Sequence, residues 1–316
     1  MSTQNQPARY WAYSNYIVAT SRLLRECYAR EVDLVQALSS SQAVTKLHAS
    51  PSADRNRVAE LLRSAWYTEV LITQLINQPT LLPYSSPWTM VQVYYAIYQH
   101  ARAYFAIAAR SIAPTHSATM SVLASDLRAC KDRFPSPWRC MCADDPRKLT
   151  ISLMNDANAP PIALSNPTSS PYTNPPWQHF GLFLKTTRRR QFQERLAEWR
   201  MRNTGRRASG SVSAGLLSTL RPTTIFDAIY RIRARSNYMD LDAFIFGSRR
   251  VSDAKLLHDS LLEIAQYSMC VFEYLIAKSA GRSWFDGTVT AFLSSPLGSP
   301  GAQSIGARWS IMSNYV

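Results

Sequence analysis

Apolar residues recur every three or four positions between Ser86 and Ser125, the spacing that places them on one face of a helix. Ser86 suits an N-cap, and Pro87 suits the first helical position, where its missing N–H costs nothing. We expect the helix to end before Pro114, because the residue preceding a proline disfavours helical dihedral angles. This stretch therefore predicts the central helix of an all-α core. Its apolar positions are Met90, Val93, Tyr94, Ile97, Ala101, Tyr104, Phe105 and Ala108.

The same periodicity predicts helices on both sides of this stretch. Residues 8–38 fit one long helix, or two helices separated by a break. Thr224 and Asp227 fit a capping box, and Ser252 fits the N-cap of the last long helix, with Gly281 as its C-terminal stop. Each predicted helix has a single apolar stripe that needs partners to bury it. We predict that four segments pack as one bundle: 58–76, 88–112, 224–236 and 253–279.

Proline and glycine content divides the chain. Half of its 18 prolines fall within residues 135–180, so regular helix is not expected there. A basic amphipathic helix is predicted at 186–203, followed by a flexible stretch at 204–215. The predicted organisation is an all-α helical bundle with four parts: an N-terminal half of the core at 1–134, a Pro-rich and Arg-rich insertion at 135–221, a C-terminal half of the core at 222–282, and an irregular tail at 283–316.

Several function classes find no support in the sequence. No run of about 18 apolar residues occurs, so no membrane span is expected. Five scattered cysteines, an odd number, favour a reducing, cytoplasmic compartment over a disulfide framework. Cys140 and Cys142 lack the two-residue spacing of a zinc knuckle. Because the chain also lacks a Gly-rich phosphate loop, a Gly-x-Ser-x-Gly elbow and a His-Glu-x-x-His motif, we expect neither a cofactor nor a metal.

The net charge of +14 is concentrated in one region. Between Lys185 and Arg250, 15 cationic residues stand against five acidic ones. A solvated helix face is the simplest origin of a charge run, but such faces usually mix signs, so we favour contact with the phosphates of RNA or another polyanion. The residues predicted to make these contacts are Arg188, Arg189, Arg190, Arg195, Arg200, Arg202, Arg206, Arg207, Arg231 and Arg235.

Two stretches stand out by their motifs. The first runs from Tyr94-Tyr95-Ala96 to His100-Ala101-Arg102 and is followed by Thr115-His116; it resembles the tyrosine-rich helix, and the Thr-His step after it, of the HEPN superfamily (higher eukaryotes and prokaryotes nucleotide-binding). Residues 229–238 resemble the family's late arginine-rich helix, with Ser-Asn-Tyr in place of Ala-Asp-Tyr. The resemblance covers roughly residues 55–130 and 222–278. It implies a bundle of four or five helices, a role in RNA cleavage, toxin–antitoxin pairs or phage defence, and often a homodimer.

Catalytic members of that superfamily are metal-independent ribonucleases that use an arginine followed, after four to six residues, by a histidine. The histidine takes the 2′-hydroxyl proton, and the arginine stabilises charge on the phosphate. Among the five histidines, His116 has such an arginine, Arg110, with five residues between them. The late helix offers Arg231, Arg233 and Arg235 without a histidine at the right distance downstream, so we favour a structural role for His116 at a helix start over catalysis.

We therefore expect an RNA-associated, HEPN-like protein of a prokaryotic defence or toxin–antitoxin system, and the residues leave metal-independent ribonuclease activity open. The alternative is a non-catalytic helical subunit whose arginines dock an acidic protein partner encoded nearby, such as a nucleotidyltransferase-like antitoxin. The excess of positive charge between Lys185 and Arg250 favours the RNA-associated protein, and the lack of a histidine after the arginines of the late helix favours the non-catalytic subunit.

Overall fold

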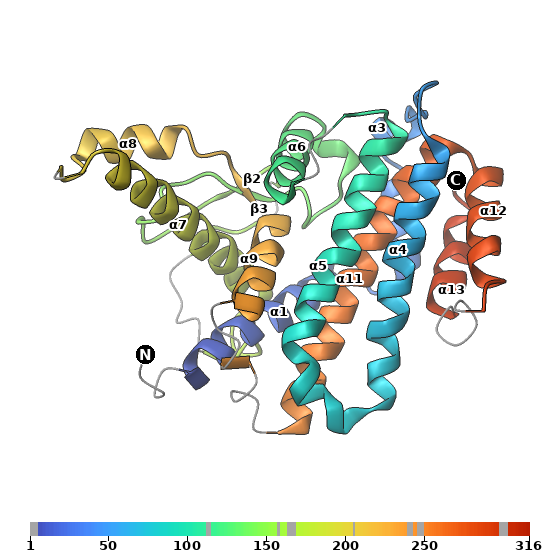
Figure 1. Cartoon of the computed structure of the whole chain (residues 1–316), viewed down its shortest axis with the longest axis horizontal. Helices are drawn as coiled ribbons and strands as arrows, with labels where there is room; N and C mark the ends of the chain where they lie inside the picture. The colour runs from blue at the N-terminus through green and yellow to red at the C-terminus, as the bar shows by residue number, and fades with distance from the viewer. Residues whose placement is uncertain are drawn as a thin grey trace.

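The central element of the fold is helix α5 (Leu82–Ile107), which lies against α4 (Arg55–Gln74), α9 (Ile225–Tyr238) and α11 (Val251–Ala280) in the computed structural model (Figure 1). The structure describes residues 6–111, 115–156, 159–162, 169–204, 206–238, 243–244, 250–296 and 303–316. The contacts of α5 confirm that the four predicted segments pack together. Pro114, the expected limit of the central helix, lies outside the described residues.

The ends of these helices test the predicted caps. Thr224 and Asp227 form the expected capping box: each backbone N–H donates to the other's side chain, at 2.9 and 3.3 Å. Gly281 ends α11 with φ = 91°, a conformation that glycine adopts without steric cost. The prediction for Ser86 is wrong: α5 begins four residues earlier, and the Ser86 hydroxyl donates to the carbonyl of Leu82 inside the helix. Ser252 is likewise not the N-cap, because α11 begins at Val251.

The first part of the chain forms two helices rather than one, α1 (Gln6–Cys27) and α2 (Glu31–Ser39). A single turn of helix, α3 (Gln42–Thr45), follows, and the short 3₁₀ turns η2 (Leu75–Asn77) and η3 (Pro79–Leu81) join α4 to α5. Helix α6 (His116–Ala129) is capped by Thr115, as its sequence indicates, and leads into the 3₁₀ turn η4 (Lys131–Arg133).

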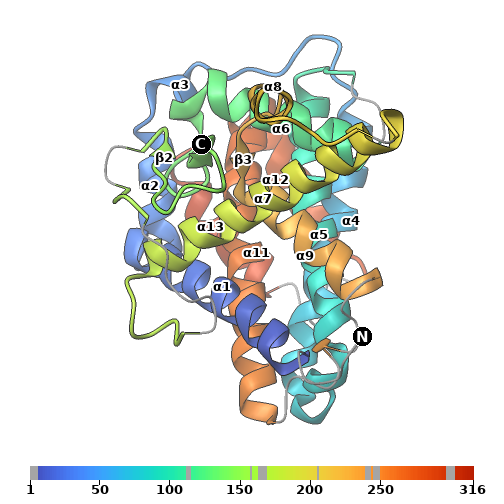
Figure 2. The ribbon, with the colours of Figure 1, turned by 90° about the vertical axis from the view of Figure 1, so that its left-hand side faces the viewer.

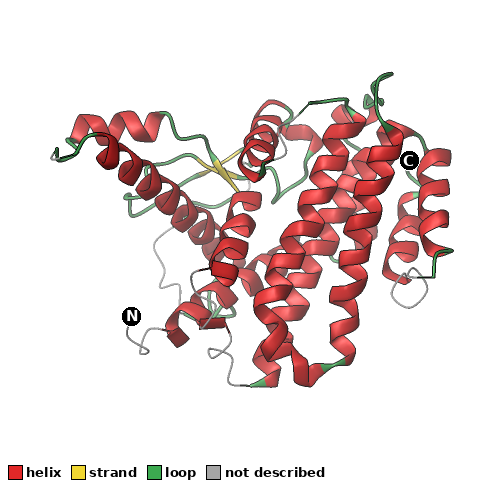
Figure 3. Cartoon of the chain, viewed as in Figure 1, coloured by secondary structure: helices red, strands yellow, loops and turns green. Residues whose placement is uncertain are grey.

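The region expected to be an insertion is built into the core. Strands β1 (Met141–Cys142), β2 (Leu153–Met154) and β3 (Thr223–Thr224) make a small antiparallel sheet in the order β2-β1-β3, visible among the helices in Figure 3. Helix α7 (Pro176–Arg202) begins ten residues before the predicted basic helix, and its first half packs on α1. Gly181 in that half faces Ile162 so closely that a Cβ there would clash with the isoleucine side chain.

Beyond Phe192, no residue of α7 is buried, and none of α8 (Gly210–Ser218) is buried either. These two segments project from the bundle as an arm (Figures 1 and 2). We call these segments, together with the residues 189–192 that lead into them, the basic arm (189–204 and 206–218). The stretch at 204–215 was expected to be flexible, but α8 begins within it, because the Ser209 hydroxyl accepts a hydrogen bond from the N–H of Val212 and so caps the helix.

The expectation of an irregular tail at 283–316 is wrong. This segment contributes α12 (Arg282–Leu293) and α13 (Gln303–Met312), which close the bundle on the side away from the basic arm (Figure 1). Phe285, Ile305 and Trp309 from these helices enter the hydrophobic core, and Arg308 reaches the centre of the bundle. In the part of the chain that the structure describes, every helix is too short or too polar to span a lipid bilayer.

Candidate functional site

His116, the first residue of α6, lies in a box of four tyrosine rings. The rings of Tyr94, Tyr95 and Tyr98 on α5 have centroids 5.4, 5.7 and 4.6 Å from that of the histidine, and Tyr230 on α9 lies at 5.8 Å. Tyr94 and Tyr98 are one helical turn apart, so both face the same neighbour. The Thr115 cap fixes where α6 starts and therefore where His116 stands. The histidine remains half-buried, so a ligand can reach it.

A hydrogen bond of 2.7 Å joins the hydroxyl of Tyr94 to Nδ1 of His116. Burial, together with the neighbouring hydroxyls of Tyr98 and Tyr230, raises the pKa of Tyr94 above its usual range, so the hydroxyl keeps its proton. When Tyr94 donates this proton to Nδ1, the neutral ring carries its own hydrogen on Nε2. His116 then offers a hydrogen-bond donor on the side away from Tyr94.

Two arginines flank the same box. Arg233 on α9 donates from Nη2 to the hydroxyl of Tyr95 at 2.9 Å, and its guanidinium carbon lies 5.4 to 5.9 Å from the ring centres of Tyr94, Tyr95 and Tyr230. Arg102 on α5 lies 5.8 Å from the ring centre of Tyr98. Burial, then Arg233 and Arg102, lower the pKa of His116 below its ordinary value. The histidine is therefore neutral at physiological pH while both neighbours are cationic.

The two charged groups that lower the pKa of His116 are both arginines. The start of α6 adds backbone N–H groups and the positive end of the helix dipole. Two guanidinium groups, an imidazole N–H and a helix N-terminus make a site suited to an anion, and above all to phosphate, which accepts several hydrogen bonds at once. We call His116, Arg102, Arg233 and the four tyrosines the tyrosine–histidine site.

The sequence paired His116 with Arg110, whose contacts in the structure are with other residues. Arg110 forms an ion pair with the buried carboxylate of Asp126 and lies against the ring of Phe105. The contribution of arginine to the tyrosine–histidine site comes from Arg102 and Arg233. Arg102 stands one turn after Tyr98, and Arg233 is the middle arginine of the late helix, so both were visible in the sequence. The missing information was that α9 crosses α5 at its tyrosines, which no local spacing reveals.

The predicted nucleic-acid-binding residues fall into two groups. Three of them make hydrogen bonds within the fold, and the prediction of a phosphate contact is corrected for Arg188, which is buried. Arg188 is buried and donates to the carbonyls of Asp144 and Arg221 at 2.7 and 2.9 Å. Arg231 donates to the hydroxyls of Thr186 and Thr187 and lies over the ring of Tyr13.

Arg235 also binds Tyr13, donating from Nε to its hydroxyl at 3.1 Å. The other predicted residues lie on the basic arm, where Arg190 pairs with Glu194 at 2.7 Å and Arg195 lies 3.8 Å from Glu198. The remaining side chains of this group are exposed to solvent and available to a partner: Arg189, Arg200, Arg202, Arg206 and Arg207.

Among the described residues, no group of three or more His, Cys, Asp or Glu side chains is placed to hold a metal ion. Cys140 and Cys142 are buried, and burial raises the pKa of the Cys142 thiol to about 11. Comparison of the chain with protein-family models, with curated proteins and with solved structures finds no match. The assignment of a function therefore depends on the residues of the site.

Proposed function

We propose that this protein binds RNA, with a backbone phosphate held at the tyrosine–histidine site and further phosphates contacted by the basic arm. One observation carries the proposal: Arg102, Arg233 and His116 come together from three helices around the four tyrosine rings. Phosphate contacts of this kind give affinity without sequence selectivity. The resemblance to the HEPN superfamily supports the same substrate class, and a place in a prokaryotic defence or toxin–antitoxin system is part of the proposal.

The test is binding of a single-stranded RNA, followed by fluorescence anisotropy at several salt concentrations. Replacing Arg102 with Gln removes one phosphate contact, so the slope of log affinity against log salt should become shallower by about 0.7. Arg128→Gln is the matched control, because Arg128 is exposed at the opposite end of α6. Equal effects of the two substitutions would place the bound RNA elsewhere.

The pH dependence of binding tests the role of His116. A bound phosphate offsets the charge of Arg102 and Arg233, so the pKa of His116 rises on binding and the complex takes up a proton. Affinity should therefore increase as the pH falls from 8 to 6. His116→Gln should remove this increase while leaving the salt dependence due to the arginines. An increase that persists in the Gln variant would exclude His116 as its source.

A second candidate function is cleavage of the bound RNA without a metal, and the lowered pKa of His116 favours it. A neutral imidazole can accept the 2′-hydroxyl proton at Nε2 in the tautomer whose Nδ1–H donates to Tyr94. The 2′-oxygen then attacks the phosphorus, and the 5′-oxygen leaves with a proton from solvent, which gives a cyclic phosphate end. The assay is cleavage in the presence of EDTA, and binding without cleavage would exclude this candidate.

Wild-type protein without salt-dependent binding to RNA would remove the nucleic-acid proposal altogether. The exposed arginines of the basic arm would then fit the alternative, an acidic protein partner. A pull-down with the product of the neighbouring gene, using the wild type and an Arg200→Ser, Arg202→Ser variant, would test that docking.

A further inference from the structure

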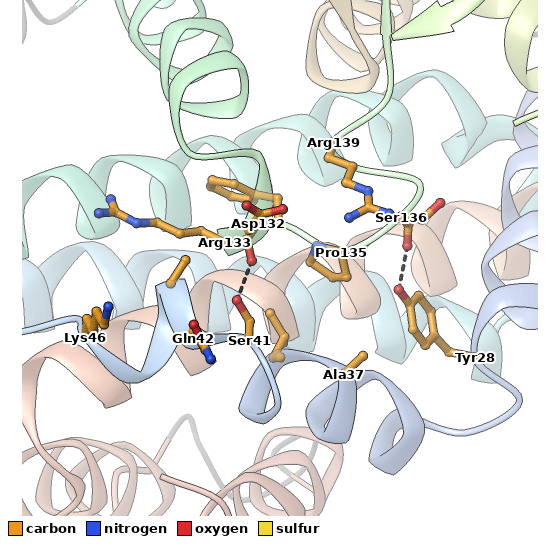
Figure 4. A pocket seen from close by; sticks show the side chains of 13 residues that line it. Tyr28, Ala37, Ser41, Gln42, Lys46, Asp132, Arg133, Pro135, Ser136 and Arg139 are labelled. Carbon is orange, nitrogen blue, oxygen red and sulfur yellow. Dashed lines mark hydrogen bonds between the residues drawn. The ribbon is translucent and has the colours of Figure 1, made fainter. Parts of the chain in front are cut away.

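A pocket of about 800 Å³ opens between α2, α3 and the segment that follows α6 (Figure 4). Pockets of this size hold small organic molecules. Two hydrogen bonds fix its walls to each other. The Ser41 hydroxyl donates to the backbone carbonyl of Asp132, and the Tyr28 hydroxyl donates to the carbonyl of Ser136 at 2.7 Å. The pocket is therefore preformed, with its shape set by contacts between distant parts of the chain.

Arg139 in the pocket wall has unused hydrogen-bonding capacity. Its side chain is 29% exposed, its Nε is buried without an acceptor among the described residues, and its nearest carboxylate, that of Asp156, lies 3.8 Å away. That separation permits an ion pair but is too long for a hydrogen bond. A largely buried guanidinium with unmade hydrogen bonds is costly to the free protein and favourable to an anionic ligand that can make them.

Two further cations line the pocket at a distance from Arg139. Lys46 and Arg133 lie toward one end of the pocket, and Arg139 lies toward the other (Figure 4). Asp132 is the one acidic residue in the lining, and when Asp156 beside Arg139 is also counted the three cations exceed the acids by one. Between the two ends the wall includes the small or apolar side chains of Ala37 and Pro135.

We infer that this pocket binds a small organic molecule with two separated anionic groups, one held by Arg139 and the other by Lys46 and Arg133. The apolar body of the ligand lies along the wall between them. The site is separate from the tyrosine–histidine site, since the two stand at opposite ends of α6, whose 14 residues span about 20 Å. The inference does not depend on the proposed function.

Adenosine 3′,5′-bisphosphate is a suitable probe because its two phosphates are separated by a sugar. Isothermal titration with the full chain should show that it binds at least tenfold more tightly than AMP, which has one phosphate, while adenosine does not bind. Citrate, a carboxylate polyanion, distinguishes recognition of phosphate from recognition of negative charge in general. Equal affinity for AMP and the bisphosphate would overturn the two-ended recognition.

Variants place the binding in this pocket. Lys46→Met should weaken bisphosphate binding about tenfold, the loss of one charge-assisted contact of about 1.4 kcal/mol, without affecting AMP held at Arg139. Lys131→Met is the matched control, because Lys131 is exposed beside the pocket but does not line it. Arg102→Gln, at the tyrosine–histidine site, should leave bisphosphate binding unchanged.

Equal losses in the Lys46 and Lys131 variants would overturn the inference, as would loss of binding in the Arg102 variant. A third result would also overturn the inference: the protein does not bind the bisphosphate, and Lys46→Met weakens its binding of single-stranded RNA. The pocket would then be part of an RNA-binding surface. Both substituted lysines are exposed, so neither variant is expected to fail to fold.

Discussion

Arg308 is a charged residue at the centre of the hydrophobic core. Its guanidinium is fully buried between two buried carboxylates, donating to both oxygens of Glu69 at 2.9 and 2.8 Å and to Glu273 at 2.6 and 2.9 Å. Burial alone would raise the pKa of Glu273, but Arg308 and His100 hold it well below its usual range. Trp66 donates to the same carboxylate at 2.7 Å. The charges of Arg308, Glu69 and Glu273 are stable in the core only together, because each offsets the cost of burying the others.

Replacing Arg308 with Met should cost about 3–5 kcal/mol in the free energy of unfolding, because it leaves two buried carboxylates without their cation. Chemical denaturation followed by circular dichroism measures this loss. Arg282→Met provides the comparison, since Arg282 is exposed on the neighbouring helix α12 and its loss should change stability by less than about 0.5 kcal/mol. Similar stabilities of the two variants would show that the buried pairs add nothing beyond packing.

His258 on α11 makes the stability of the fold sensitive to acid. The ring is buried, and burial lowers its pKa below the ordinary value, so the folded protein holds it neutral. The unfolded chain takes up the proton first, near pH 6.5, and stability is therefore complete above that pH and falls as the pH drops below it.

In the His258→Leu variant this loss should be smaller between pH 7 and 5. The slope of unfolding free energy against pH should decrease by up to about 1.4 kcal/mol per unit. It should not vanish, because burial also lowers the pKa of His179. Urea denaturation at several pH values gives the slope, and identical slopes for wild type and variant would exclude His258 as a source of acid sensitivity.

At the scale of elements, α7 combines two surfaces in one helix. Its first half is buried, and the ring of Phe183 stacks on that of Tyr16 in α1 at 5.1 Å. Its second half is exposed and cationic. Arg188 and Arg189 stand at the junction and differ completely in their surroundings, although they are neighbours in the sequence. Arg188 is buried, whereas Arg189 is exposed.

This junction yields a paired prediction. Arg188→Met should destabilise the protein by about 2–3 kcal/mol, because the carbonyls of Asp144 and Arg221 lose their buried donor. Arg189→Met should change stability by less than about 0.5 kcal/mol and should flatten the salt dependence of RNA binding. Melting temperatures and binding isotherms for both variants test this difference. The reverse order of stabilities would contradict the buried role of Arg188.

The elements were predictable where local chemistry decides them. The stripe of α5 and the Thr224–Asp227 capping box both follow from spacing and side-chain type, and each is present. The errors lie where tertiary contacts outweigh composition. Proline at the first position of α7 is compatible with a helix, and burial of Phe180 and Phe183 stabilises a segment whose composition indicated a loop. Helices α12 and α13 form in a Ser- and Gly-rich tail because their apolar faces meet the bundle.

The tyrosine–histidine site shows the same limit. Its residue types were apparent, since tyrosines at four-residue spacing and a Thr-His step stand out in the sequence. The arginine that lies near His116 was not apparent, because Arg110 is close to His116 along the chain whereas Arg233 is close to it in space. A count of charges likewise cannot predict that Arg188, which begins a run of three arginines, is buried.

At the scale of the whole molecule, the four parts predicted from the sequence (1–134, 135–221, 222–282 and 283–316) contribute to a single hydrophobic core. Trp138 in the expected insertion donates to Ser268 on α11 at 3.0 Å, and Phe226 on α9 packs against Phe272 on α11 at 5.6 Å. We therefore expect unfolding in a single transition, with the same midpoint by far-UV circular dichroism and by tryptophan fluorescence. Separate midpoints would indicate that residues 135–221 unfold as a domain of their own.

The distance along the chain between Arg308 and its partners matters during synthesis. Glu69 precedes Arg308 by 239 residues and Glu273 by 35, so the ribosome makes both acids before the cation that neutralises them. A nascent chain that has not reached Arg308 cannot close its centre without burying unpaired charge. The region around Glu69 and Glu273 therefore stays exposed to water until Arg308 has been synthesised. A product of translation that stops before Arg308 is left with an unfolded core, which makes it sensitive to proteolysis.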